Sequence, residues 1–337
     1  ATGSGGTSAG GGGSTAADGW LRTEGNHIVR SDGSIWRGRG ANIHDTRSCN
    51  ACTWYEPDVN EALRRIYELV DVWGANFIRL DLESYAAPQS CHVHWESLLD
   101  DPDYFADVVT MVEHVGTKQD VYVLLSLWID PSQDDNGWPT AQTNTTWQAL
   151  AGQFLDAPYV MYGIINEPED NFDGSLDAQV WQRMDDAVAA IRSVEDTAGA
   201  RRHIVAVQGT GAWARRLEYY VDHPITAGDG ENVAYEIHIY NPQSDFDSML
   251  APATTLPVII GEHGPSNIGN MTLADCEALQ VLAESRDIPY LAWTFHQRCP
   301  PNLIEETAGG CGIGMDLVPT TWGLSLQQRL ATAWGTP

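Results

Sequence analysis

Short apolar runs recur along the chain between residues 39 and 295, and longer segments with a different spacing separate them. The runs are rich in β-branched and aromatic residues, which is typical of buried strands, whereas the segments between them repeat apolar residues every three or four positions, which is typical of amphipathic helices. Strands are predicted over residues 39–43, 77–82, 121–127, 160–165, 204–207, 233–239, 258–260 and 290–295. Helices are predicted over residues 59–73, 104–115, 178–194 and 273–283.

Eight apolar strands that alternate with helices predict an α/β fold, a closed (β/α)8 or TIM barrel, because parallel barrel strands are buried on both faces. A doubly wound sheet is the alternative. It would carry a glycine-rich phosphate loop after its first strand, and Gly38, Gly40 and Ala41 do not match that fingerprint. Ahead of the barrel, residues 27–30 and 34–37 flank Ser-Asp-Gly, so a short N-terminal β-hairpin is predicted there.

The first 17 residues differ in composition from the rest of the chain. They contain only Ala, Thr, Gly and Ser, which cannot bury apolar area, so residues 1–17 are predicted to be a flexible linker. The alternation of strands and helices has no break after it, and residues 18–337 are predicted to form a single domain. We expect a monomer whose linker joins it to an anchor or a second module.

The charge of the chain limits its partners. Its 337 residues include 46 acidic and 18 basic side chains, which gives a formal net charge of −28. Such a surface repels phosphate backbones, so nucleic acid is excluded as a partner. No apolar run is long enough to span a membrane. The acidic, lysine-poor exterior favours a secreted or cell-surface protein.

Six cysteines form an even set, and disulfides are expected in an extracellular protein. Cys299 and Cys311 are predicted to be partners because they share one predicted loop. Cys49 and Cys52 form a C-x-x-C pair, but a second pair that would complete a zinc site is lacking, and no metal or other cofactor is predicted.

Two glutamates directly follow apolar strands, where the functional groups of a TIM barrel lie. Glu167 follows the fourth strand in Ile-Ile-Asn-Glu-Pro, and Glu262 follows the seventh in Ile-Ile-Gly-Glu-His. Paired carboxyl groups hydrolyse glycosidic bonds, one protonating the leaving oxygen while the other attacks the anomeric carbon or activates water. The alternative, that each glutamate only pairs with an arginine to hold strand ends, accounts for one such residue better than for two.

With these motifs in order, residues 32 to 293 resemble a family 5 glycoside hydrolase of clan A, a group of retaining (β/α)8 enzymes that includes cellulases and β-mannanases. The resemblance implies that Glu167 is the general acid/base and Glu262 the nucleophile. It also implies that Asn166 hydrogen-bonds the sugar 2-hydroxyl and that Arg79 keeps the nucleophile ionised. The charge of Glu262 would then raise the pKa of Glu167.

Further supporting residues are implied by the same resemblance. His238 and Tyr240 match a His-x-Tyr after strand six, with the tyrosine hydroxyl near the nucleophile, and Trp293 matches a tryptophan that supports the reacting sugar. Many cellulases of the family end strand three in Trp-His, whereas here Trp128 stands where the histidine is expected. His44 could supply an imidazole to that space, and Trp128 could stack on a sugar ring.

The predicted function is therefore a retaining endo-β-1,4-glycanase that acts on cellulose or β-glucan. An endo-β-1,4-mannanase is the first alternative, because mannanases of the family also lack that histidine. A carbohydrate-binding protein on an inactive barrel is the non-enzymatic alternative, and the intact set of predicted catalytic residues speaks against it. A metal-dependent barrel enzyme would need a His/Asp ligand cluster at strand ends that this sequence does not offer.

Overall fold

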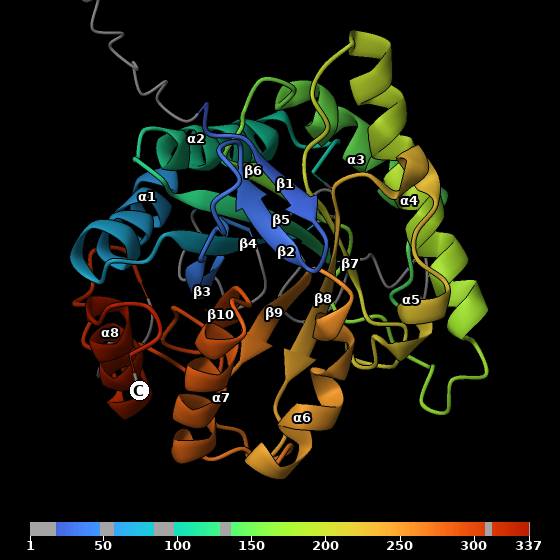
Figure 1. The fold of residues 1–337 in the computed structure, drawn as a ribbon. Coiled ribbons are helices and arrows are strands. Elements are labelled where there is room, and N and C mark those ends of the chain that lie inside the picture. Colours follow the sequence, from blue (N-terminus) through green and yellow to red (C-terminus); the bar gives the residue numbers. More distant parts are fainter. Residues whose placement is uncertain (1–17, 48–56, 84–97, 129–135, 307–311, 337) are drawn as a thin grey trace, which may run out of the picture.

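The computed structural model describes residues 18–47, 57–83, 98–128, 136–306 and 312–336 (Figure 1). Eight parallel strands close into a barrel in the order β10-β3-β4-β5-β6-β7-β8-β9, which confirms the predicted (β/α)8 fold. The strands are β3 (Arg39–His44), β4 (Phe77–Glu83), β5 (Tyr122–Trp128), β6 (Val160–Gly163), β7 (Val205–Gln208), β8 (Val233–Ile239), β9 (Val258–His263) and β10 (Tyr290–Ala292). Each lies within a few residues of its predicted range.

Helices cover the outside of the barrel. The main ones are α1 (Val59–Tyr67), α2 (Pro102–Gly116), α3 (Ala141–Gln153), α4 (Asp177–Ala198), α7 (Leu273–Ser285) and α8 (Thr321–Ala331), with the short α5 (Glu218–Asp222) and α6 (Phe246–Met249). The helix predicted over residues 59–73 is α1 followed by a π-helical turn, η1 (Glu68–Val72). Short 3-10 turns are η2 (Ala227–Gly230), η3 (Gln243–Asp245) and η4 (Ala251–Thr254). No helix of the described ranges is both long and apolar enough to cross a membrane.

The N-terminal hairpin exists, and one of its arms is the predicted strand over residues 27–30, but the other arm lies before that strand and not after it. Strand β1 (Leu21–Glu24) pairs antiparallel with β2 (His27–Arg30), and the pair lies across one end of the barrel (Figure 1). The Ser-Asp-Gly turn follows β2, and the predicted second arm keeps only one bridge, between Val29 and Ile35. The prediction erred because the first arm has a single buried apolar residue, Leu21, and so lacks the alternation that marks a strand.

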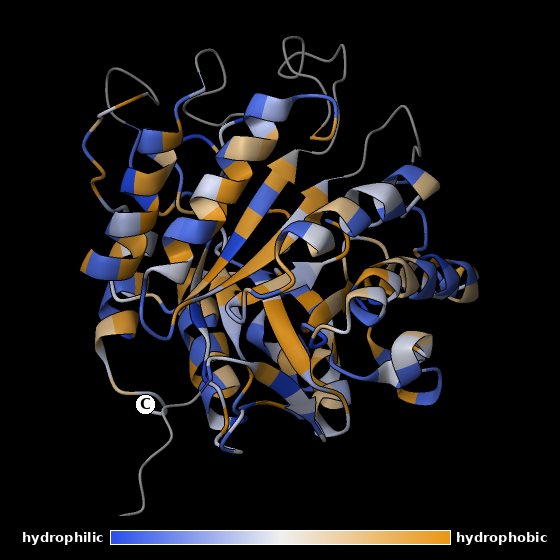
Figure 2. Cartoon of the chain, turned by 90° about the horizontal axis from the view of Figure 1, so that it is seen from above, coloured by the Kyte–Doolittle hydropathy of each residue, from blue (hydrophilic) through white to orange (hydrophobic). Residues whose placement is uncertain are grey.

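The barrel interior changes from apolar to charged along its axis. At the end covered by the hairpin, Trp36 packs edge-on against Phe77 within an inner apolar cluster. Inward-facing positions of a strand recur every second residue, so the inward side of β4 continues from Phe77 to Arg79 and Asp81. In Figure 2 the strands are mostly hydrophobic, whereas the helices around them carry both hydrophilic and hydrophobic residues. Because Arg79 and Asp81 follow Phe77 along β4, the charged layer lies at the carboxyl ends of the strands.

Disulfides were expected from the even set of six cysteines, but Cys276 is a free cysteine. Its thiol is buried in the face of α7 that packs on the barrel, and it forms no disulfide. Burial raises the pKa of this thiol well above its usual range. Cys49, Cys52, Cys91 and Cys311 lie outside the described residues, so the pairing of Cys299 with Cys311 stays a prediction.

Candidate active site

A cleft of about 480 Å³ opens at the carboxyl ends of the barrel strands. Glu167 comes after β6 and Glu262 belongs to β9, so two elements far apart in the sequence bring the two carboxyl groups into one hollow. Of the residues predicted for the site, the following line the cleft: Trp128, Asn166, Glu167, Tyr240, Glu262 and Trp293.

A β-bulge turns Glu262 into the barrel. Strand β9 pairs with β8 in register up to Ile260, and then Glu262 pairs with His238 so that Gly261 is the extra residue. Ile259 faces the interior and Ile260 the helix layer, so without the bulge Glu262 would face outward. A Cβ atom on Gly261 would lie 2.0 Å from a carboxylate oxygen of Glu236, so only glycine fits here.

The guanidinium of Arg79 lies at the centre of the buried charges. Its Nη1 lies 2.9 Å from Oε1 of Glu262 and 2.9 Å from Oδ1 of Asp81, and its Nε lies 2.9 Å from Oε1 of Glu236. Its Nη2 donates to the side-chain oxygen of Asn166 at 2.8 Å. Burial disfavours the charged guanidinium, but these carboxylates outweigh burial and raise the pKa of Arg79.

His238 connects three carboxyl groups. Its Nδ1 lies 2.8 Å from Oε1 of Glu167 and 3.5 Å from Oε1 of Glu262, and its Nε2 lies 3.1 Å from Oε1 of Glu236. Burial alone would lower the pKa of His238, but the charge of Glu262 and the hydrogen bonds to Glu167 and Glu236 raise it to about 9. At neutral pH the ring is therefore an imidazolium that donates from both nitrogens.

The acidities of the two glutamates are the reverse of those expected. Burial and the charge of Glu167 raise the pKa of Glu262 to about 7, against the opposing effects of His238, Arg79 and Tyr240. Burial also acts on Glu167, but the hydrogen bond from His238 and the charges of His238, Arg79 and Arg215 together outweigh it and lower the pKa of Glu167. The expectation considered Arg79 and the charge of Glu262 but not His238, which places its positive charge directly against Glu167.

Two further predicted residues contact this network. The hydroxyl of Tyr240, just after β8, donates to Oε2 of Glu262 at 2.8 Å. The side-chain oxygen of Asn166 accepts from Arg79, which fixes the amide so that its NH2 group is left for a ligand in the cleft. Both residues orient groups that a sugar would meet.

Glu167 is held in a left-handed backbone conformation, with φ of +48°. Its backbone N–H donates to the side-chain oxygen of Gln208 at the end of β7, at 2.6 Å. Such a conformation costs free energy in a non-glycine residue and persists where surrounding contacts hold it. The side chain is 28% exposed, against 5% for Glu262, so Glu167 is the carboxyl that faces the open cleft.

The predicted aromatic and histidine residues divide into two groups. Trp293, after β10, and Trp128, at the end of β5, line the cleft. His44, at the end of β3, is buried and packs edge-on against Trp293, with ring centroids 5.7 Å apart. Burial and the charge of Arg65 lower the pKa of His44 to about 4, so it supports Trp293 as a neutral ring.

Glu236, Trp213 and Arg215 belong to the site but were not predicted from the sequence. Glu236 is fully buried inside β8, and its signal was a carboxyl within an otherwise apolar strand, which rarely occurs without a charged partner. Trp213 and Arg215 also line the cleft from the loop after β7. That loop has no regular element, so neither strand ends nor spacing indicated them.

Among the described residues, one group has the composition of a metal site: Glu167, His238 and Glu262, with one potential ligand atom from each lying within 4.8 Å of the others. The raised pKa of His238 opposes metal binding because a protonated ring offers no lone pair. The Arg79 guanidinium also already contacts Glu262. These groups are better explained as one hydrogen-bonded network.

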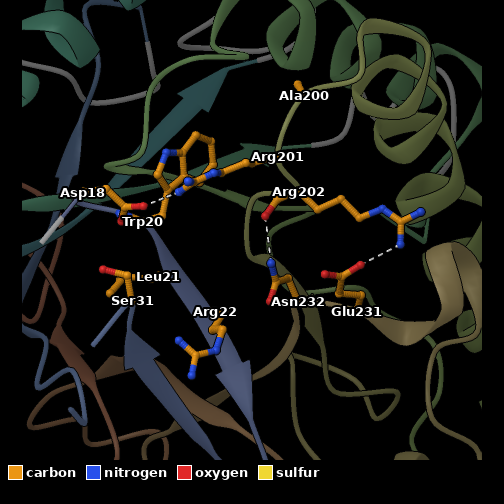
Figure 3. Close-up of a pocket in the computed structure, with 10 residues that line it drawn as sticks. All are labelled: Asp18, Trp20, Leu21, Arg22, Ser31, Ala200, Arg201, Arg202, Glu231 and Asn232. Carbon is orange, nitrogen blue, oxygen red and sulfur yellow. Dashed lines mark hydrogen bonds and ion pairs between the residues drawn. The ribbon is translucent and has the colours of Figure 1, made fainter. Parts of the chain in front are cut away.

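A second hollow, of about 500 Å³, lies at the opposite end of the barrel beside the hairpin (Figure 3). Arg22, Arg201 and Arg202 line it, and each forms an ion pair with an acidic residue: Arg22 with Glu24, Arg201 with Asp18, and Arg202 with Asp196 and Glu231. This hollow lies at the amino ends of β7 and β8, the end of a TIM barrel that serves stability.

A closed parallel barrel that gathers two facing glutamates, an arginine, a histidine and a tyrosine at the carboxyl ends of its strands defines a class: barrel enzymes that hydrolyse glycosidic bonds. The sequence model of the cellulase family, glycosyl hydrolase family 5, matches residues 34–298, and the chain belongs to that family.

Curated relatives carry endoglucanase names. The chain is 23% identical over 230 residues to endoglucanase C of Evansella cellulosilytica, a match that covers 63% of this chain and 25% of that protein. It is 24% identical over 205 residues to endoglucanase EG-II of Hypocrea jecorina, covering 52% of this chain and 47% of the relative. The matched region thus spans a quarter to a half of these proteins.

Solved structures share the fold. The catalytic domain of the endoglucanase Cel5A of Thermobifida fusca superposes with a TM-score of 0.71 at 18% identity, covering 94% of this chain and all of that domain. A β-mannanase from Thermomonospora fusca superposes with a TM-score of 0.66 at 18% identity, covering 90% of this chain and 92% of the other. At these identities the likeness concerns the fold.

Proposed function

We propose that this protein is a retaining endo-β-1,4-glucanase acting on cellulose or mixed β-glucan. The observation that carries the proposal is the short separation of the two glutamates. One carboxylate oxygen of Glu167 lies within 4.8 Å of one carboxylate oxygen of Glu262. Retaining enzymes hold their carboxyl groups about 5 to 5.5 Å apart, whereas inverting enzymes leave room for a water between them. The endoglucanase relatives support the choice of substrate.

In this mechanism Glu262 attacks the anomeric carbon while Glu167 protonates the departing glycosidic oxygen. A covalent glycosyl-enzyme forms, and Glu167 then takes a proton from the water that releases the sugar. Tyr240 and Arg79 hold Glu262 in position through hydrogen bonds of 2.8 and 2.9 Å. Asn166 offers its amide NH2 to the neighbouring sugar hydroxyl.

The first step needs a protonated Glu167 and an ionised Glu262, the opposite of the arrangement favoured in the free site. The two protonation arrangements differ only in which glutamate carries one proton. His238 can pass its Nδ1 proton to Glu167 across 2.8 Å and take the proton of Glu262 across 3.5 Å, with no net change in charge. A glycosidic oxygen that accepts a hydrogen bond from Glu167 would favour this shift.

A β-1,4-mannanase is the second candidate. Trp128 ends β5 and lines the cleft where many cellulases of the family place a histidine, and a β-mannanase is among the similar structures. Polymers of either kind are too large to enter a cell, so we propose extracellular action in both cases.

The test is a panel of carboxymethylcellulose, mixed-linkage β-glucan, glucomannan, galactomannan and xylan, with sizing of the products. We expect β-glucan to be cut into a mixture of oligosaccharides whose newly formed ends keep the β-configuration by NMR. Glu262→Gln should lower kcat by at least about a thousandfold, in the range seen when a catalytic nucleophile is removed. The exposed Glu218→Gln is the matched control. Cleavage of galactomannan without β-glucan would favour the mannanase.

A further inference from the structure

Arg215 lines the active-site cleft, and its positive charge contributes to lowering the pKa of Glu167. The chain carries 46 acidic residues against 18 basic ones, yet within the described ranges no ion pair includes Arg215. The next residue differs, because Arg216 lies 3.4 Å from Asp177 and donates to the carbonyl oxygen of Asn171 at 2.9 Å. In so acidic a protein, a cation of the cleft that forms no ion pair among the described residues calls for an explanation.

The backbone holds Arg215 firmly in place. Gly211 and Arg215 exchange two backbone hydrogen bonds, of 2.8 and 3.1 Å, and the N–H of Trp213 donates to the carbonyl oxygen of Pro168 at 2.9 Å. Trp213 and Ala214 have φ of +60° and +55°, which are left-handed conformations that non-glycine residues adopt only where contacts impose them. The loop is thus fastened beside Glu167.

The guanidinium rests on an exposed aromatic surface. Its Cζ lies 5.4 Å from the centre of the Trp213 ring, which is a cation–π contact. Trp213 is 39% exposed and meets Phe172, 63% exposed, with ring centroids 5.1 Å apart. A stacked guanidinium uses its face for the ring and keeps its N–H donors in its own plane, so they remain available to a ligand.

Arg215 lies on the leaving-group side of the cleft. The loop after β7 borders the segment after β6 that carries Glu167, whereas the nucleophile Glu262 belongs to β9. In the proposed reaction Glu167 protonates the leaving oxygen, so the part of the glycan that departs passes along this loop. This placement of Arg215 on the leaving-group side rests on the proposed function.

We propose that Arg215, supported by Trp213, forms a subsite for a carboxylate on the leaving-group half of the glycan, as in a hexuronic acid or another carboxylated sugar. Neutral amide donors such as Asn166 suffice for sugar hydroxyls. A full positive charge adds attraction only for an anion, and the planar fork of a guanidinium binds a carboxylate through two parallel hydrogen bonds.

The test compares two β-1,4-linked gluco-oligosaccharides of equal length, one neutral and one oxidised to a C6 carboxylate in its leaving-group half. We expect the ratio of kcat/KM for the carboxylated over the neutral substrate to fall about tenfold or more in Arg215→Gln, the loss typical of a charge-assisted hydrogen bond. Arg183→Gln, which removes an exposed charge from α4, should leave the ratio unchanged. An equal loss on both substrates would overturn the proposal.

Binding separates this subsite from the proposed function. Calorimetry on Glu262→Gln should show tighter binding of the carboxylated oligosaccharide, and adding Arg215→Gln should remove that preference. If the native enzyme cleaves neither substrate but this preference is present, the subsite stands and the glucanase proposal fails. Equal binding of both oligosaccharides, or binding of neither, rejects the subsite whatever the enzyme hydrolyses.

Discussion

Glu236→Gln tests whether buried carboxylates keep His238 protonated. Glu236 is fully buried, and its Oε1 lies 2.9 Å from Nε of Arg79 and 3.1 Å from Nε2 of His238. Glutamine keeps the size of the side chain and removes its charge. The rise in the pKa of His238 from 6.5 to about 9 corresponds to about 3 kcal/mol in favour of the imidazolium, at about 1.4 kcal/mol per pKa unit.

Three carboxyl groups share this stabilisation, from Glu167 at 2.8 Å, Glu236 at 3.1 Å and Glu262 at 3.5 Å. Loss of one should remove roughly a third of the attraction or more, so we expect the pKa of His238 to fall to about 7 to 8 in the variant. A histidine whose folded pKa is raised stabilises the fold fully below pH 6.5 and loses that contribution as pH rises through 9. The free energy of unfolding should therefore decline less across this window in Glu236→Gln.

The measurement is an NMR pH titration of the histidine rings between pH 5 and 10, with His238→Gln to assign the resonance. Glu231→Gln, at an exposed glutamate near the opposite end of the barrel, is the matched control and should leave the titration of His238 unchanged. If His238 still titrates near pH 9 in Glu236→Gln, the explanation of its charge by these carboxylates is refuted.

Three further predictions concern other parts of the protein. Glu167→Ala should lose far less kcat/KM on an aryl cellobioside with a good leaving group than on β-glucan, because kcat/KM reports formation of the glycosyl-enzyme and such a leaving group needs no proton; an equal loss of kcat/KM on both would contradict its role as acid. Gly261→Ala should lower both activity and Tm because its Cβ would lie 2.0 Å from Glu236, whereas Gly152→Ala, 3.9 Å from its nearest neighbour in a helix, should raise stability by about 0.5 to 1 kcal/mol in chemical denaturation. Burial lowers the pKa of His263 to about 4, so the neutral ring contributes to the free energy of unfolding above pH 6.5, and this contribution falls by about 3 kcal/mol on acidification toward pH 4. Denaturation curves should show less acid sensitivity in His263→Gln, and a variant that keeps the full acid sensitivity would argue against this.

Much of the fold could be predicted because barrel strands are buried on both faces. Each strand is then a continuous apolar run, and β8 was predicted with the same limits, residues 233–239, as it has in the structure. The helix α3 escaped prediction because polar residues such as Thr143 and Thr146 are buried on its inner side, which weakens the apolar periodicity. The hairpin was misplaced because β1 carries too little apolar pattern.

The sequence by itself determined which side-chain groups meet at the site. Apolar strands that end in Asn-Glu-Pro and in Gly-Glu-His place carboxyl groups at the carboxyl ends of a barrel, whatever the details of packing. It also determined that Arg79, His238 and Tyr240 share that end, because each belongs to a strand or directly follows one. Residues on irregular loops, such as Trp213 and Arg215, carried no such signal.

Only the tertiary structure decided how these groups act on one another. The bulge at Gly261 turns Glu262 inward, and barrel closure then places the His238 ring between two glutamates that lie 95 positions apart in the chain, Glu167 and Glu262. The pKa of a buried carboxyl group depends on desolvation and on charges a few ångströms away. Those distances follow from strand register and burial, and they reverse the acidities that the residue types alone had suggested.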